Sequence, residues 1–331
     1  MNVLVTGATG FIGRHLIERL THEGAHTRAL VLSIEDASAI ESLGVEIVHG
    51  DIRDYQAVER AMKDCQLVFH LAAKTEAPGL PRKIFRAVNV QGTENIARAA
   101  LSAGAGRLVF ASSTSVYGRF TENRVIDEDT PTKPDSPYGE SKMLAERILV
   151  SHHVRDGLPV VVARIVDVLG PGAVSWLGLF RSIASGHFRL IGSGDNYYHP
   201  VDVADVIDGL VLCGTVKGVE GRTYVITGRE QLQLHELIQM IGEEVGMPHL
   251  PESLPAAPLY LYMILNRLIY AYSGCRLPRS DRIGFFLSHR RFDIFRASQE
   301  LGYAPKVSMK ESLHRTAEWF KAQGYIQTHF N

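Results

Sequence analysis

The chain has 331 residues, 45% of them apolar, and a formal net charge of −1. This length suits one large α/β unit with a smaller lobe, and the near-neutral charge gives no electrostatic basis for nucleic acid as a general partner. Cys65, Cys213 and Cys275 are far apart and fit neither a disulfide framework nor a zinc pattern, which indicates a reducing, cytoplasmic compartment. Because no basic segment or cleavage site precedes the first apolar run, we do not expect secretion.

The first thirteen residues have the pattern of a strand, a glycine-rich turn and a helix. Residues 3–5 are apolar, residues 6–13 read TGATGFIG, and apolar residues then recur every fourth position from Ile12. Gly7 permits a tight turn, Gly10 lets backbone N–H groups approach a pyrophosphate, and Gly13 lets the helix pack close to the strand. The phosphates would lie at the positive end of the helix. A glycine-rich surface turn is the alternative, but the flanking strand and helix favour a nicotinamide dinucleotide site.

Further apolar runs predict the rest of a parallel sheet. Strands are expected at residues 27–32, 45–48, 67–71 and 107–111, and helices at 83–103 and 138–157. Strands that alternate with helices in this way are typical of an α/β fold. We therefore predict a Rossmann-type doubly wound parallel sheet with a smaller, mostly helical C-terminal substrate lobe.

The end of the second strand normally decides which dinucleotide is bound. A carboxylate there accepts from the adenosine ribose hydroxyls, whereas an arginine meets a 2′-phosphate. Here the strand ends in Val31, Leu32 and Ser33, which supply neither group. Arg14 lies in the first turn of the glycine-loop helix, where a cation opposes the helix dipole, so a nearby anion would explain it. A solvated arginine is the alternative, and the pattern leans towards NADP over NAD.

Further positions are expected near the cofactor. Asp51 follows the third strand at the edge where such sheets bind ligands, so its carboxylate could accept from the adenine amino group. A turn or helix-capping aspartate is the alternative. Ala72 and Ala73 follow the fourth strand, where small side chains let the backbone approach the cofactor. Asn89, inside the predicted helix at 83–103, is expected to brace the backbone of the active site.

Tyr138 and Lys142 lie four residues apart at the start of a predicted helix, so their side chains share one face. An isolated phenol has a pKa of about 10 and is a poor proton carrier near neutrality. A neighbouring ammonium favours the phenolate, and hydride transfer at a nicotinamide needs such a proton partner. Ser113, at the end of the fifth strand, could hydrogen-bond the same substrate oxygen. A Tyr-x-x-x-Lys pair alone is usually a surface pair, but the glycine turn and the serine cluster favour catalysis.

These segments together resemble the extended short-chain dehydrogenase/reductases of the NAD-dependent epimerase/dehydratase superfamily, and most closely its 3β-hydroxysteroid dehydrogenase-like and dihydroflavonol reductase-like branch. The motifs that carry the resemblance are residues 6–13, 50–51, 71–73, 89–93, 112–113, 138–142, Arg164 with 170–171, and 199–205, and residues 292–319 resemble the closing segment of that branch. The resemblance implies Tyr138 as acid/base, Lys142 as its modulator and ribose ligand, and Ser113 as donor to the substrate oxygen. It also implies a homodimer formed through the helices at 83–103 and 138–155.

The pattern and the resemblance together give the expected limits and contacts. Residues 1–165 would form the dinucleotide-binding domain, with a returning piece near 196–230, and residues 166–195 and 231–331 the substrate lobe. The expected cofactor contacts are Gly7, Thr9, Gly10, Phe11, Ile12, Gly13, Arg14, Ser33, Asp51, Ile52, Leu71, Ala72, Ala73, Asn89, Tyr138, Lys142 and Val166, and the expected substrate contacts are Lys74, Ser113, Thr114, Asp167 and Tyr197. No metal is predicted, because the adjacent His152 and His153 point apart on a helix and no His pair has ligand spacing with an acid.

Departures from the family pattern narrow the reaction. The dehydratases resemble one another in an Asp-Glu pair after the Ser/Thr, where this chain has Thr114 and Ser115, so dehydration is disfavoured. The epimerases have an Asn three residues after the strand arginine and an arginine before the His-x-x-Asp motif. Here Asp167 holds the first place and no arginine the second, so nothing obvious neutralises a nucleotide diphosphate. The alternative is that Arg181, Arg189 or Arg279 substitutes.

Residues 256–272 are apolar nearly all round and contain only Asn266 and Arg267 as strongly polar positions. The stretch is shorter than a bilayer span, so we do not expect a transmembrane helix. An all-round apolar helix is usually buried, so a buried cap helix is expected. A wall for an apolar substrate or a peripheral membrane contact are the alternatives.

The sequence therefore predicts an NAD(P)-dependent enzyme that interconverts a ketone and a secondary alcohol on a moderately apolar, non-nucleotide small molecule, with Tyr138 moving the proton. A nucleotide-sugar epimerase that uses the same Ser113, Tyr138 and Lys142 is the first alternative. A dinucleotide-sensing protein without turnover is the second, and the presence of all three side chains disfavours it.

Overall fold

The computed structural model describes the chain except residues 76–78, 120–121, 250–251, 274–285, 287 and 327–331. Its main layer is a seven-stranded parallel sheet in the order β12-β7-β5-β4-β1-β2-β3. The strands are β1 (Asn2–Thr6), β2 (His26–Val31), β3 (Glu46–His49), β4 (Leu67–His70), β5 (Arg107–Ser113), β7 (Val160–Ile165) and β12 (Thr223–Ile226). The order reverses between β1 and β4, which is where such sheets bind ligands. The predicted Rossmann-type sheet is confirmed.

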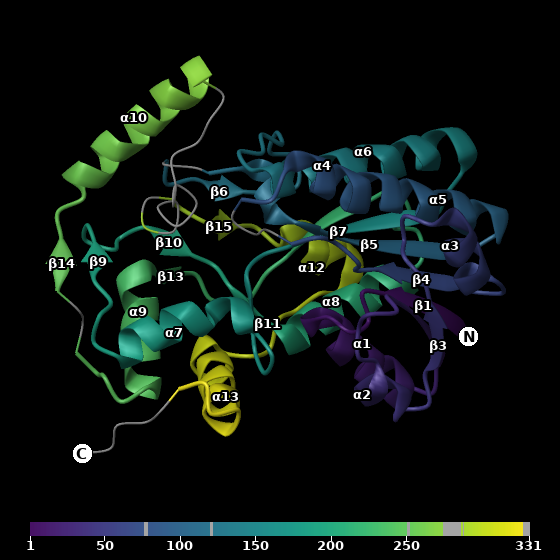
Figure 1. Cartoon of the computed structure of the whole chain (residues 1–331), viewed down its shortest axis with the longest axis horizontal. Coiled ribbons are helices and arrows are strands. Elements are labelled where there is room, and N and C mark those ends of the chain that lie inside the picture. The colour runs from purple at the N-terminus through teal and green to yellow at the C-terminus, as the bar shows by residue number, and fades with distance from the viewer. Residues whose placement is uncertain (76–78, 120–121, 250–251, 274–285, 287, 327–331) are drawn as a thin grey trace.

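Helices cover both faces of this sheet (Figure 1). One face is covered by α1 (Phe11–His22) and α8 (Val203–Thr215), and the other by α3 (Tyr55–Met62), α5 (Gly92–Ser102) and α6 (Pro137–Asp156). Side chains alternate along a strand, so Val3 and Val5 pack in the first of these layers and Leu4 in the second. Strands buried on both faces are nearly continuous apolar runs, which is why the runs alone predicted them.

The helix predicted at 83–103 is continuous but changes its winding. It begins as α4 (Arg82–Phe85), passes through a π-helical segment, η1 (Arg86–Gln91), and continues as α5. Asn89 lies in the π-helical segment and is buried. A π-helical turn inside an α-helix is frequent at functional sites, because the wider turn redirects one side chain.

The C-terminal lobe has a core of its own. Phe180, Leu237 and Phe320 are buried there by α7 (Leu177–Ala184), α9 (Leu234–Glu244) and α13 (Met309–Ala322). Four short strand pairs accompany it: β8 (Val168–Leu169) with β11 (Val201–Asp202), β9 (Leu190–Ile191) with β14 (Ser253–Leu254), β10 (Tyr197–Tyr198) with β13 (Leu232–Gln233), and β6 (Val125–Ile126) with β15 (Arg291–Phe292). The predicted smaller, mostly helical lobe is confirmed.

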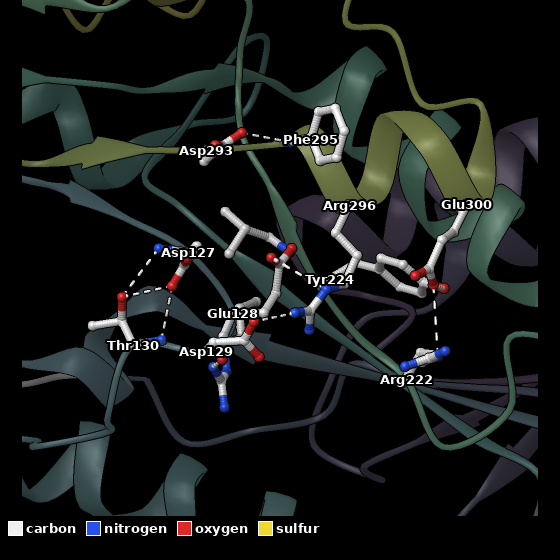
Figure 2. Close-up of polar contacts among 12 residues, drawn as sticks. Asp127, Glu128, Asp129, Thr130, Arg222, Tyr224, Asp293, Phe295, Arg296 and Glu300 are labelled. Carbon is white, nitrogen blue, oxygen red and sulfur yellow. Dashed lines mark hydrogen bonds and ion pairs between the residues drawn. The ribbon is translucent and has the colours of Figure 1, made fainter.

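The long polar loop at 119–137 is tied to the edge of the main sheet, as Figure 2 shows. The Glu128 carboxylate accepts from the backbone N–H of Val225 in β12 (2.7 Å), and burial raises the pKa of this carboxyl. Arg296, in α12 (Phe295–Leu301), donates to the neighbouring Asp129 (2.6 Å) and lies beside Glu128. Segments that are 167 residues apart in sequence are thereby held together, which fixes residues 128–129 against α12.

The expectation that residues 256–272 form a buried cap helix is wrong. They form α10 (Ala257–Ser273), which projects from the lobe in Figure 1, and Leu261, Ile264 and Leu268 are exposed. An apolar sequence does not by itself determine whether a helix is buried within its own chain. The core of the lobe is built by α7, α9 and α13 instead. Within the described ranges, no helix is long and apolar enough to cross a membrane.

Candidate functional site

The glycine-rich turn after β1 forms a cradle in front of α1. Gly7 has φ of +71°, and a Cβ there would lie 2.7 Å from the backbone nitrogen of Ala72. A Cβ at Gly13 would lie 2.1 Å from the Gly7 carbonyl oxygen, so neither position admits a larger residue. The N-cap of α1 is Gly10, no side chain caps the helix, and its first turn has no acidic residue. The first N–H groups of α1 therefore point at the place expected for a diphosphate.

A carboxylate that the sequence analysis did not single out lies beside this cradle. Thr9 Oγ1 donates to Glu35 Oε2 (2.6 Å), and Arg14 Nε donates to the backbone oxygen of Thr9 (2.9 Å). The neighbouring Asp36 feels the positive charge of Arg14. The Asp36 carboxylate therefore supplies part of the negative charge that was expected near Arg14. Glu35 follows the exposed Ser33 by two residues, so a search slightly past the strand end would have found it.

The residues after β3 contribute a turn and an apolar wall. The Asp51 carboxylate accepts from the backbone N–H of Arg53 (2.8 Å) and from its guanidinium (2.6 Å), and the Arg53 hydrogen bonds lower the pKa of this carboxyl. Asp51 therefore occupies a tight turn at the sheet edge. Ile52 is buried and packs where a Cβ on Gly92 would lie, 2.6 Å from Ile52 Cδ1, which fixes α5 against this turn.

A buried histidine connects the ends of β1 and β4 to η1 and α5. His70 Nδ1 lies 2.8 Å from Thr6 Oγ1, and His70 Nε2 lies 3.0 Å from Thr93 Oγ1. Since Thr93 Oγ1 donates to the backbone oxygen of Asn89 (2.6 Å), it accepts from Nε2–H, and Nδ1 accepts from Thr6. Thr6 Oγ1 in turn accepts from the N–H of Ala72 (3.2 Å). This chain of bonds fixes the neutral tautomer and holds the segment that follows β4.

Asn89 braces the same segment from the other side. Its Oδ1 accepts from the N–H of Lys74 (2.7 Å), and its Nδ2 donates to the oxygen of Lys74 (3.0 Å) and to Ser141 Oγ (2.8 Å). Ser141 Oγ donates to the backbone oxygen of Tyr138 (2.7 Å). Residues 71–73 are half-buried in this frame, while the Lys74 side chain is exposed. The bracing of the backbone expected of Asn89 is observed, and it extends to the first turn of α6.

Lys142 carries an amine into the interior. Its side chain is buried, and Nζ donates to the backbone oxygen of Ala111 in β5 (2.6 Å) and lies 4.5 Å from the centre of the Phe110 ring. Burial lowers the pKa of Lys142 to about 7, and the negative charge of Glu146 offsets part of this shift. The amine is therefore poised to change charge near neutral pH.

Ser113 and Tyr138 lie on adjoining segments. Ser113 Oγ accepts from the N–H and the hydroxyl of Ser115 (3.2 and 3.0 Å), so its own hydroxyl hydrogen remains available to donate. Gly139 packs so closely on this turn that a Cβ would lie 2.4 Å from the Ser115 carbonyl oxygen. Tyr138 is half-buried, and Thr114 begins the short helix η2 (Thr114–Tyr117). The start of α6 is thereby held against the end of β5.

A buried ion pair supports this junction from behind. The Glu146 carboxylate accepts from Arg164 Nη2 (2.8 Å) and from Ser112 Oγ (2.5 Å), and Arg164 also donates to the Tyr117 hydroxyl (2.8 Å). The pair is almost fully buried, with 9% and 8% of the Arg164 and Glu146 side chains exposed. Buried charges persist when they are paired and hydrogen-bonded. The pair therefore fixes β5, α6 and β7 relative to one another.

The segment after β7 leads to the side of the site where the substrate is expected. Val166 is buried, and Asp167 pairs with Arg290. Burial raises the pKa of Tyr198 well above its ordinary value, and its hydroxyl donates to Asp167 (2.6 Å). The sequence showed nothing obvious to neutralise a nucleotide diphosphate near Asp167. Arg290 does lie there, but it is already paired with Asp167. No sequence spacing predicts this pairing, because 123 residues separate the partners.

The other basic residues considered for the substrate side have different surroundings. Arg181 Nε donates to the backbone oxygen of Tyr325 (2.8 Å), and Arg189 donates to the backbone oxygen of Gly186 (2.8 Å). Arg279 lies outside the described residues. Tyr197, in β10, is half-buried with the Arg291 guanidinium 4.7 Å from its ring centre.

The geometry agrees with what comparison with known proteins finds. Residues 3–227 match the NAD dependent epimerase/dehydratase family. The chain belongs to this family. It is an NAD(P)-dependent enzyme of the extended short-chain dehydrogenase/reductase type, which confirms the resemblance drawn from the motifs.

Similar members of this family differ in what their names say they act on. The 3beta-hydroxysteroid-dehydrogenase/decarboxylase isoform 1 of Arabidopsis thaliana is 29% identical, over 98% of this chain and 81% of that protein. The N-acetyl-alpha-D-glucosaminyl-diphospho-ditrans,octacis-undecaprenol 4-epimerase of Escherichia coli O157:H7 is 27% identical, over 96% of this chain and 95% of that protein. The crystal structure of DesIV, a dTDP-glucose 4,6-dehydratase of Streptomyces venezuelae with NAD bound, is 26% identical with a TM-score of 0.79 and covers 99% of each chain.

The buried His70 predicts a pH dependence of stability. Burial, with a smaller contribution from the Lys142 charge, lowers the pKa of His70 to about 3 from its ordinary 6.5. Between these values the unfolded chain binds a proton that the folded chain does not, so the free energy of unfolding should fall as the pH drops below 6.5. The loss attributable to this residue approaches about 1.4 kcal/mol per pH unit. Urea unfolding of the wild type and His70→Gln at several pH values measures the difference in slope.

His70→Gln should have a lower free energy of unfolding at neutral pH than the wild type. That free energy should also depend less steeply on pH below 6.5. His187→Gln, which changes an exposed histidine, is the matched control and should keep the wild-type slope. Equal slopes for the wild type and His70→Gln would contradict the assignment of a neutral, buried imidazole.

Proposed function

We propose that the protein interconverts a ketone and a secondary alcohol on a moderately apolar, non-nucleotide substrate. The observation that carries the proposal is the buried Lys142 amine, with its pKa near 7, one helical turn after Tyr138. An ammonium at this place stabilises the phenolate of Tyr138 and brings the phenol into a working range. Tyr138 then gives a proton to a carbonyl oxygen or takes one from an alcohol.

Ser113 completes the proposed site. Because Ser113 Oγ already accepts from Ser115, its hydroxyl hydrogen is free to be donated to the same substrate oxygen as Tyr138 addresses. That hydrogen bond would orient the substrate and stabilise the negative charge that develops on the oxygen. Thr114, Lys74, Asp167 and Tyr197 are proposed as further substrate contacts on the lobe side.

The residues fit a nicotinamide dinucleotide. The cradle at Gly7, Gly10 and Gly13 leaves room for a diphosphate in front of α1, and a Cβ would close it. When bound, the dinucleotide supplies the acceptor or donor of hydride. The segment 71–73 and Lys142 would hold the ribose next to the nicotinamide, and Asp51 would lie near the adenine. The small side chains of Ala72 and Ala73 let the backbone approach the cofactor.

Two observations support an apolar substrate over a sugar nucleotide. Asp167 already neutralises Arg290, so a diphosphate would have to separate this pair before it could use the arginine. The Arabidopsis relative is named for a hydroxysteroid, which is an apolar secondary alcohol. The epimerase alternative is favoured by the similarity to the E. coli enzyme, and it would use the same Tyr138.

Substitution of Tyr138 tests the proposal. Tyr138→Phe should lower kcat for reduction of apolar cyclic ketones, such as a 3-ketosteroid, by roughly 10²- to 10⁴-fold, because it removes the proton donor. NADH should still bind, because the other expected cofactor contacts remain. The measurement is NADH oxidation across a panel of such ketones, in parallel with epimerisation of UDP-N-acetylglucosamine.

Tyr325→Phe, which removes the hydroxyl of a tyrosine in the lobe, should retain wild-type activity. Epimerisation without ketone reduction would favour the epimerase. Dinucleotide binding with no turnover of either class would favour the sensing protein, and full ketone reduction by Tyr138→Phe would contradict the role of the phenol.

We further propose that NAD is preferred over NADP. The sequence leaned towards NADP because no carboxylate was found at the end of β2 and Arg14 lacked an anion. Glu35 now supplies a carboxylate against Thr9, next to the cradle. A carboxylate there accepts from ribose hydroxyls and repels a 2′-phosphate.

Titration with both dinucleotides tests this preference. The wild type should bind NADH more tightly than NADPH. Glu35→Gln should reduce the ratio of the two dissociation constants by roughly tenfold, since it removes the repulsion between the Glu35 carboxylate and the 2′-phosphate of NADPH. Glu41→Gln, at an exposed acid in α2 (Ser38–Glu41), is the control and should leave the ratio unchanged. Tighter binding of NADPH than of NADH by the wild type would contradict this proposal and support the preference for NADP indicated by the sequence.

We also propose that the protein forms a homodimer through α5 and α6. A cytoplasmic location is proposed as well. Val150 and Val154 of α6 are exposed apolar residues on the rim of a hollow of about 500 Å³. A monomer in light scattering at all concentrations would contradict the dimer.

Cys65 and Cys213 are free, buried thiols, as expected in a reducing compartment.

A further inference from the structure

Helix α10 presents a continuous apolar stripe to solvent. Leu261, Ile264, Leu265, Leu268 and Tyr272 are 59%, 57%, 46%, 62% and 97% exposed. They are spaced by three and four residues, so they lie along one face of the helix. Figure 1 shows this helix standing off from the lobe, joined to it through β14. An exposed apolar surface of this kind marks a contact site, because leaving it in water is unfavourable.

The sequence composition of α10 and its neighbouring residues indicates the chemistry of the partner. In sequence, residues 253–280 contain no Asp or Glu but include Arg267, Arg276 and Arg279, whereas the whole chain has a net charge of −1. Residues 260–272 also include four tyrosines, a residue type enriched at the interface between membrane and water. Each arginine near an anionic lipid surface strengthens binding by roughly fivefold. An anionic membrane surface binds segments that combine apolar, aromatic and cationic residues and lack acidic ones.

The dimensions of α10 favour a helix that lies on the membrane. Its 17 residues span roughly 25 Å, less than the roughly 30 Å of a bilayer core. A helix of this length therefore suits the surface of a bilayer better than its interior.

We propose that α10 docks this enzyme on an anionic lipid membrane, with the helix in the plane of the surface and the stripe Leu261, Ile264, Leu265, Leu268 and Tyr272 inserted among the lipids. The apolar side chains supply the affinity, and the excess of arginine over acidic residues in the sequence of residues 253–280 supplies the preference for anionic lipid. A substrate dissolved in the membrane would then be met where the enzyme is held. The proposal does not depend on the proposed reaction, because it concerns only the surface of α10.

Vesicle flotation of the full chain tests the proposal. The wild type should float with vesicles of phosphatidylcholine and phosphatidylglycerol, less with phosphatidylcholine alone, and less at high salt, which screens the arginines. Leu265→Glu with Leu268→Glu should reduce partitioning into the vesicles at least about tenfold, since two leucines that would insert among the lipids are replaced by charges that the lipid excludes. Phe295→Glu is the matched control, because it replaces a 68% exposed aromatic residue of α12, and it should float like the wild type.

Two measurements keep the test independent of folding defects. Both glutamate variants should bind NADH like the wild type, as expected for substitutions at exposed positions. Leu268→Trp should show a blue shift in its fluorescence on addition of the anionic vesicles. Failure of the wild type to float, or of the tryptophan to shift, would overturn the proposal. So would a wild-type dimer in light scattering that the double glutamate variant dissociates without any vesicle binding, because α10 would then join two copies.

Discussion

The Lys142 amine is held where an ammonium is unfavourable, and the arrangement of the site follows from that constraint. Its hydrogen bond to the Ala111 carbonyl and its place over the Phe110 ring compensate part of the lost hydration. The remaining cost appears as a pKa near 7, so the charge that can activate Tyr138 is present only in part at neutral pH. A small change in the surroundings, such as a bound ribose or a nearby anion, would shift that charge strongly.

Two buried polar frames keep the amine in this position. On one side, Glu146 and Arg164 fix α6 against β5 and β7. On the other, His70 and Asn89 connect the ends of β1 and β4 to η1, α5 and the first turn of α6. Polar groups in such frames are costly to leave unpaired, so each frame favours one arrangement of the strand ends. The proposed active site is thereby organised by the ends of the sheet strands.

The sequence predicted what depends on local pattern and failed where distant segments decide. The strands, the glycine turn and the Tyr138–Lys142 spacing are local, and their placement in the fold was anticipated. Arg290 reaches Asp167 across 123 residues, which no spacing reveals. The apolar composition of residues 256–272 predicted a buried helix, which is wrong, because the core of the lobe is formed by other helices.

Direct observation of the amine is the most decisive measurement of this account. Lysine-selective ¹³C labelling, with Lys142→Arg to assign the resonance, allows the Lys142 side chain to be titrated in the free protein by NMR. The account predicts a midpoint near pH 7. A midpoint near the ordinary value of about 10.4 for lysine would contradict it, because the amine would then be fully hydrated or fully paired and burial would not set its charge.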